Sequence, residues 1–157
     1  MNTVRIEIAQ LVARLDETMN SLTRRSAIRR LYSQLASIAG APLERPSYLV
    51  LKQLVADGPR RITDLAAEHG VEPSTMSRHT RALEDAGFVV KLGDPGDGRV
   101  SLAEPTKSGR RVVERFETAR NELLTAVLSE WDTDEAERFV ELFERFNTDI
   151  SDLLDKR

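Results

Sequence analysis

The segment 62–102 reads ITDLAAEHGVEPSTMSRHTRALEDAGFVVKLGDPGDGRVSL and decides the fold class. Apolar residues at spacings of three and four predict a short helix over 62–69. Gly70 suits the left-handed turn that ends such a helix. A proline, which is tolerated in a first helical turn, opens a second predicted helix over 73–85, and Gly87 ends it. This order of signals predicts a helix-turn-helix.

The second of these helices has a polar face that lacks carboxylates until its last turn. The residues expected to face the core are Met76, Thr80, Leu83 and Ala86. The residues expected to face outward and contact DNA are Ser74, Thr75, Ser77, Arg78, His79 and Arg81. Hydroxyl side chains allow close approach to a duplex, and guanidinium groups match guanine edges and phosphate oxygens. On an isolated helix this face would be solvated surface, but the preceding turn and the following hairpin favour a recognition helix in the major groove.

Strand-forming residues on both sides of a turn-rich stretch predict a β-hairpin with strands over 88–92 and 99–103. Lys91 and Arg99 flank the turn and are expected to contact DNA. Asp97 lies two residues before Arg99, where its carboxylate can orient the guanidinium for entry into a minor groove. A hairpin at this place is the wing of a winged helix-turn-helix, so we expect a mainly α fold with a small β-hairpin.

Residues 46–110 resemble the MarR (multiple antibiotic resistance regulator) family of bacterial transcription factors. The resemblance rests on Pro46–Leu51, Arg61–Ala66, Ser74–Arg78, Leu83–Val89 and Asp94–Arg99, followed by Thr106 and Gly109. It implies a homodimer that binds a pseudo-palindromic operator, usually as a repressor, and is released by a small molecule or by thiol oxidation. Pro105 stands where the family usually has leucine, which leaves the exact end of the second wing strand open.

The composition narrows these expectations. The 157 residues include no cysteine, which excludes disulfides, zinc–thiolate sites and thiol-based sensing. Release by a small-molecule effector is what the resemblance implies. No apolar run approaches the roughly 20 residues of a membrane span. The first residues lack a signal-peptide core, and we expect a cytoplasmic location.

The net charge of −3 is unevenly distributed. Residues 60–111 hold nine basic and eight acidic side chains, whereas residues 112–157 hold six basic and thirteen acidic ones. The module expected to face DNA is therefore nearly neutral, and the excess of acid lies at the C-terminal end. We expect modest non-specific affinity for DNA, since little general field adds to the specific contacts.

Long amphipathic helices are predicted at both ends of the chain. Residues 4–39 form either one bent helix or two, and a helix over about 46–56 follows. Thr106 is expected to cap a helix that reaches about residue 130, and a last helix covers about 134–154. We therefore expect an N-terminal dimerisation arm, a winged helix-turn-helix domain and C-terminal helices that complete the dimerisation region. Their predicted bounds are 1–40, 41–105 and 106–157.

The apolar faces of the terminal helices favour packing against a second copy over an intramolecular helical hairpin. The resemblance implies an effector pocket where these helices meet the wing module. Its candidate residues are Arg29, Tyr32, Leu35, Tyr48, Leu51 and Lys52. Aromatic and aliphatic residues at helical spacing are more often core, and that interpretation stays open for most of them.

Catalytic, metal and cofactor sites are not expected. The two histidines, His69 and His79, lie on different predicted helices, and no ligand spacing, phosphate-binding loop or nucleophile motif is present. We therefore expect a sequence-specific DNA-binding regulator and no enzyme. The alternative is a winged-helix protein-interaction module that does not bind DNA.

Overall fold

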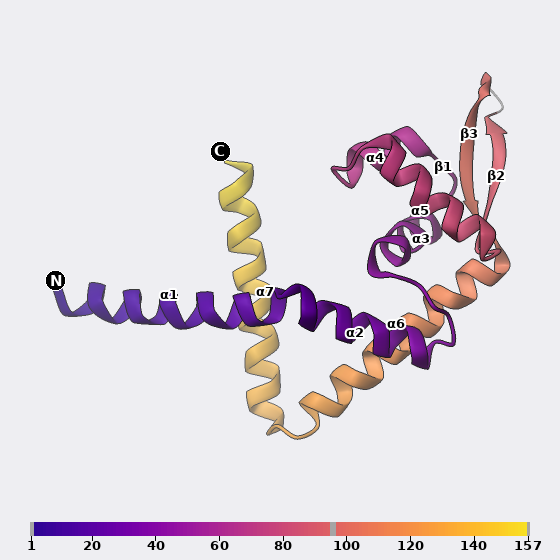
Figure 1. Ribbon diagram of the computed structural model, residues 1–157. Coiled ribbons are helices and arrows are strands. Elements are labelled where there is room, and N and C mark those ends of the chain that lie inside the picture. The colour runs from indigo at the N-terminus through magenta and orange to yellow at the C-terminus, as the bar shows by residue number, and fades with distance from the viewer. Residues whose placement is uncertain (1, 95–96, 157) are drawn as a thin grey trace. The chain divides into compact units, whose positions relative to one another are not determined.

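The computed structural model describes the backbone of residues 2–94 and 97–156 and the side chains of residues 7–93 and 102–156. Its elements (Figure 1) are α1 (Asn2–Thr23), α2 (Arg25–Ile38), α3 (Arg45–Asp57), β1 (Arg60–Arg61), α4 (Ile62–Glu68), α5 (Pro73–Asp85), β2 (Val89–Asp94), β3 (Asp97–Pro105), α6 (Lys107–Leu128) and α7 (Thr133–Asp155). The fold is mainly helical with a small antiparallel sheet, as predicted.

The chain divides into two compact units, Met1–Glu117 and Thr118–Arg157. The first contains α1 to α5, the sheet and the first half of α6, and the second contains the rest of α6 and α7. Buried residues of α6 lie on both sides of the division, Val112, Val113 and Phe116 before it and Ala119 after it.

The core of the first unit lies where α2, α3 and α6 supply aromatic rings. The rings of Tyr48 and Phe116 stack, with centroids 4.5 Å apart, and Tyr32 is tilted against Tyr48 at 5.8 Å. Leucines from α3, α4 and α5 complete the core, and burial of such side chains contributes about 1.5–3 kcal/mol each. The sequence predicts burial of four leucines, Leu49, Leu54, Leu65 and Leu83. The last three are fully buried, whereas Leu49 is half-buried.

Helix α5 has the predicted bounds because both of its ends carry strong local signals. Pro73 occupies the first turn, and Gly87 follows the helix with a φ of 74° that favours glycine. Met76, Thr80 and Leu83 are buried as predicted, and the Thr80 hydroxyl donates to backbone carbonyls of its own helix. The prediction that Ala86 faces inward is wrong, since the helix ends at Asp85 and Ala86 is exposed.

The wing is a hairpin of β2 and β3. Compared with the predicted strands, β2 begins one residue later and ends two residues later, and β3 is two residues longer at each end. Val89 pairs with Pro105, so β3 ends at Pro105, the residue near which the sequence did not define the end of the second wing strand. A two-residue strand, β1, was not predicted and pairs with the base of β3, giving the strand order β1-β3-β2. Figure 1 shows the hairpin projecting beyond α4 and α5.

Thr106 joins the base of the wing to α6. Its hydroxyl donates to the carbonyl of Gly87 at 2.8 Å and accepts from the N–H of Gly109 at 3.0 Å, which makes it the predicted cap of α6. Gly109 is buried, and a Cβ atom there would lie 2.2 Å from the carbonyl oxygen of Phe88 and 3.1 Å from Cδ1 of Leu51. The close approach of α6 to the wing base therefore requires glycine.

Gly109→Ala is expected to lower stability by about 2 kcal/mol. Alanine favours a helix over glycine by about 1 kcal/mol, but the clash with a backbone carbonyl forces a shift that costs more. Thermal unfolding should show a Tm lower by about 4–8 °C. The matched control is Gly93→Ala, where an added Cβ meets nothing within 4 Å. An equal Tm in both variants would contradict this packing.

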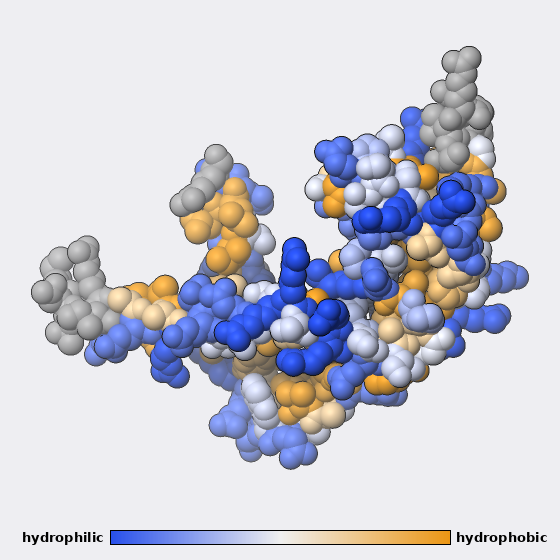
Figure 2. Space-filling model, viewed as in Figure 1, coloured by the Kyte–Doolittle hydropathy of each residue, from blue (hydrophilic) through white to orange (hydrophobic). Residues whose placement is uncertain are grey.

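The terminal helices carry apolar side chains that no described element of their own unit buries. The segment 4–39 forms two helices, α1 and α2, because Arg24 adopts an extended backbone with ψ of 131°. α7 begins after Asp132, whose carboxylate accepts from the N–H of Asp134. Large apolar side chains of α1 and α7 are exposed, and orange surface follows both helices in Figure 2. In the described part of the chain, every helix is too short or too polar to cross a membrane.

Candidate nucleic-acid interface

The polar face of α5 is open to solvent. Ser74, Ser77, Arg78 and Arg81 are exposed, and Thr75 is half-buried. The first turn of α5 contains no acidic residue. Because the opposite side of the helix is held in the core by Met76, Thr80 and Leu83, this polar face is fixed outward. Hydroxyls and guanidinium groups on such a face can donate hydrogen bonds to phosphates and base edges.

His79 has a second environment beside this face, and its expected contact with DNA stays a prediction. Its ring is half-buried against α3, where Nδ1 and the buried Ser47 Oγ form a hydrogen bond of 3.3 Å. Burial lowers the pKa of His79 below its usual 6.5, and the positive charge of Arg78 adds to this effect. Glu44 raises this pKa and His69 lowers it, each by a smaller effect. His79 is therefore favoured as a neutral link between α3 and α5.

Acidification is expected to destabilise the fold through His79. Because the pKa of His79 is lower in the folded chain, the unfolded chain binds more protons as the pH falls through about 6.5, and stability falls with pH there. His79→Asn keeps a polar partner for Ser47 but does not titrate. Urea unfolding at pH 5.5 and 7.5 should show a smaller difference in the variant than in the parent. An equal difference in stability between the two pH values in variant and parent would show that His79 does not cause the acid destabilisation.

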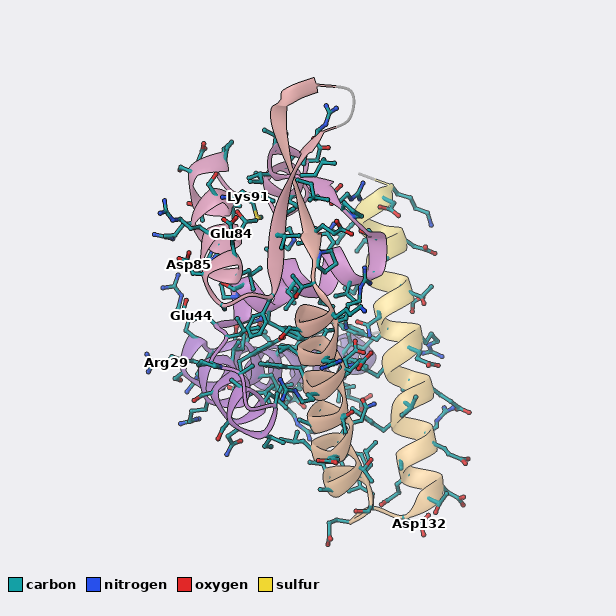
Figure 3. All side chains as sticks on the ribbon, turned by 90° about the vertical axis from the view of Figure 1, so that its right-hand side faces the viewer. Arg29, Glu44, Glu84, Asp85, Lys91 and Asp132 are labelled. Atoms are coloured by element: carbon teal, nitrogen blue, oxygen red, sulfur yellow. The ribbon has the colours of Figure 1, made fainter. Side chains whose placement is uncertain are left out.

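The three predicted DNA-contacting residues of the wing divide into one whose side chain the structure describes and two whose side chains it does not. Lys91 is described, and its Nζ forms an ion pair of 2.9 Å with Oε2 of Glu84 in the last turn of α5. Figure 3 labels both residues where the hairpin meets that helix. The side chains of Asp97 and Arg99 lie outside the described residues, so their expected contact with the minor groove stays a prediction.

A polar network that the sequence does not indicate connects α3 with β1 and α4. The Gln53 amide donates to a carboxylate oxygen of Glu68, and His69 Nε2 donates to Gln53 Oε1 at 2.7 Å. Arg60 forms ion pairs with Glu68 at 3.1 Å and Asp57 at 3.5 Å. The network holds the first helix of the helix-turn-helix against α3. Its partners are 15 and 16 residues apart in the pairs formed by Gln53, a separation that no local pattern reveals.

A pocket of about 870 Å³ lies between α2 and the segment 40–46. Arg29 and Tyr32, two of the predicted effector residues, line it together with apolar side chains such as Ile28 and Leu43. Arg45 stands over the ring of Tyr32, 5.5 Å from its centroid. Figure 3 labels Arg29 and Glu44 on this side of the first unit.

The other predicted effector residues lie elsewhere. Leu35, Tyr48 and Leu51 are buried core residues and do not line the pocket. Lys52 forms an ion pair of 3.2 Å with Glu117 of α6. The helical spacing identified an apolar stripe, but it did not distinguish side chains that pack on protein from those that face a cavity.

Among the described residues, no group of three histidine or acidic side chains is arranged to hold a metal ion. Two surface features of the first unit, the polar face of α5 and the pocket beside α2, are therefore the candidates for binding sites.

Comparison with known proteins places these features in a family. The model of the MarR family matches residues 43–101. YxaD of Bacillus subtilis, named as an uncharacterized HTH-type transcriptional regulator, is 43% identical over 105 residues, which are 67% of this chain and 73% of YxaD.

Solved structures give the same result. A MarR family protein from Bacillus stearothermophilus matches with a TM-score of 0.74 and 19% identity, covering 91% of this chain and 97% of that one. A MepR-like protein complexed with pseudoligands matches with a TM-score of 0.53 and 30% identity, covering 92% and 94% of the two chains. The first likeness concerns the fold alone, and the second extends to sequence.

Proposed function

Because this chain belongs to the MarR family of HTH-type transcriptional regulators, which are not enzymes, we propose that it is an operator-binding repressor that acts as a homodimer. In this proposal, α5 enters the major groove, the wing enters the adjacent minor groove, and a small molecule bound beside α2 releases the operator. The cytoplasmic location expected from the sequence belongs to the same proposal, since the operator lies on the chromosome.

The observation that carries DNA binding is the exposed face of α5. Its serines and arginines point away from the core, and acidic side chains follow only in the last turn. A helix presented in this way beside a projecting hairpin has the geometry that reads base edges in one groove and backbone or base edges in the next. The predicted contacts of Ser74, Thr75, Ser77, Arg78 and Arg81 are retained in the proposal.

The exposed apolar faces of the terminal helices support the homodimer. On α7, Phe139, Phe143, Ile150 and Leu153 are each more than two-fifths exposed, and Ile8, Leu11 and Leu15 repeat the pattern on α1. An interface of obligate size, above about 2,000 Å², would cover such faces. Two-fold symmetry would then set the recognition helices about 34 Å apart, opposite half-sites with centres about 10 base pairs apart.

The pocket beside α2 supports an organic anion as the effector. Apolar side chains and the ring of Tyr32 offer a surface for a hydrophobic body, and the guanidinium groups of Arg25, Arg29 and Arg45 offer partners for an acidic group. A screen of small organic acids for release of the operator tests this part. Release that is lost in Arg29→Ala, with DNA affinity unchanged, is the expected result.

The function itself is tested with DNA from upstream of the chain's own gene and with a random-sequence library. We expect selection of an inverted repeat, with affinity that falls as salt rises. Inserting five base pairs between half-sites turns one of them by about half a helical turn and should abolish tight binding. If the folded dimer selects no sequence from the library, the protein-interaction module becomes the better interpretation.

A further inference from the structure

The ion pair of Glu84 with Lys91 lies between the last turn of α5 and the first strand of the wing. Side chains alternate between the two faces of a strand, so Lys91 shares a face with Val89. Val89 is buried, and the Lys91 ammonium on the same face lies 2.9 Å from the Glu84 carboxylate. Figure 3 labels Lys91 and Glu84 close together at this junction. Lys91 therefore reaches back to the recognition helix.

The base of the hairpin is fixed to α5, because the Phe88 N–H donates to the Leu83 carbonyl at 2.9 Å and Val89 is buried. Gly87, with its left-handed backbone, makes the connection, and β1 pairs with β3 only at Ala103 and Leu102. Farther along β2, the ion pair of Glu84 and Lys91 is a further connection between α5 and the hairpin. A strand rises about 3.3 Å per residue, so a tilt of about 10° at Lys91 would move Asp94, the end of β2, by about 2 Å.

We propose that Glu84 and Lys91 are positioning residues that fix the wing relative to the recognition helix, and that Lys91 is not a phosphate contact. The inference rests on the proposed function, in which α5 and the wing enter neighbouring grooves at the same time. A displacement of about 2 Å is enough to lose hydrogen bonds in one groove while the other stays occupied. It also gives a role to a carboxylate near the end of a DNA-facing helix.

The proposal predicts an effect of unusual sign. Removing a carboxylate near DNA ordinarily strengthens binding, because repulsion from phosphates is relieved. Glu84→Gln is expected to weaken binding about five-fold, since a half-exposed ion pair is lost in each of two protomers. Lys91→Gln and the double variant should weaken binding to the same extent. The exchanged pair Glu84→Lys with Lys91→Glu should restore most of the affinity.

The experiment measures the affinity of the full-length variants for the operator that the parent selects from a random library. Asp85→Asn is the matched control, because Asp85 is the exposed neighbouring carboxylate on a different side of α5, and its affinity should be equal or higher. Hydroxyl-radical footprints of Glu84→Gln should lose minor-groove protection at the operator edges. Dimethyl sulfate protection of guanine N7 in the major groove should persist.

Two results would overturn the proposal while leaving the proposed function intact. The first is tighter or equal binding by Glu84→Gln together with weaker binding by Lys91→Gln, as a direct phosphate contact requires. The second is loss of major-groove and minor-groove protection together, as a general loss of fold requires. If the parent itself selects no operator, the proposed function fails first, and the two failures are thereby distinguished.

Discussion

Replacing Phe143 with glutamate is expected to convert the protein into a monomer that no longer binds its operator tightly. Phe143 is 54% exposed on the apolar face of α7. In a two-fold symmetric interface each residue occurs twice, so one substitution removes two aromatic side chains and buries two charges. A loss of about 1.5–3 kcal/mol for each ring raises the dimer dissociation constant by about 10²-fold or more. Sedimentation equilibrium and operator binding measure the two consequences.

Thr148→Glu is the matched control for this result. Thr148 lies five residues after Phe143, on the polar side of α7. The substitution Thr148→Glu therefore introduces the same charge on the same helix. We expect it to remain a dimer with unchanged affinity. If the Phe143→Glu variant remained a dimer, this face of α7 would be excluded from the interface. A monomer that kept tight binding would instead show that recognition does not require the dimer.

Arg78→Ala is expected to produce the second large effect. Arg78 is exposed on the polar face of α5, and a bidentate contact between an arginine and a guanine contributes about 1–3 kcal/mol of discrimination. Loss at both half-sites should weaken operator binding at least about 30-fold and relax the preference at one position in each half-site. Quantitative library selection at pH 8 measures both effects, at a pH where His79 is neutral in parent and variant.

The control for Arg78→Ala is Arg111→Ala, which removes an equal charge from an exposed position on α6. It should leave base preference unchanged and alter affinity only slightly. If both variants lose affinity equally across all sequences, Arg78 acts through general charge. In that case a different side chain of α5 reads the bases.

Local signals explain how well the sequence predicts the helices. Pro73 and Gly87 are strong signals at the two ends of α5, and its predicted bounds are those observed. β1 has no such signal, because two consecutive arginines form a strand only where β3 offers a partner. Helical periodicity likewise places Phe143 on an apolar face of α7 without showing which surface covers it.

Contacts between distant segments decide the surroundings of several predicted site residues. His79 follows Arg78 on the same helix, and its ring forms a hydrogen bond with Ser47, 32 residues earlier in the chain. Tyr48 and Tyr32 both belong to apolar helical patterns, but stacking on Phe116 makes Tyr48 a core residue. Sequence patterns define the faces of a helix, whereas contacts between distant segments decide what each face meets.

The hydrogen bonds of Thr106 have a consequence for the evolution of specificity. They close the wing into a loop whose two ends, at Gly87 and Thr106, are held together regardless of what lies between the strands. The entropy of closing such a loop grows only logarithmically with length, and a doubling costs about 0.6 kcal/mol. Residues can therefore be inserted between β2 and β3 at little cost to the fold. The reach of the wing along a minor groove can diversify while α5 and its core stay unchanged.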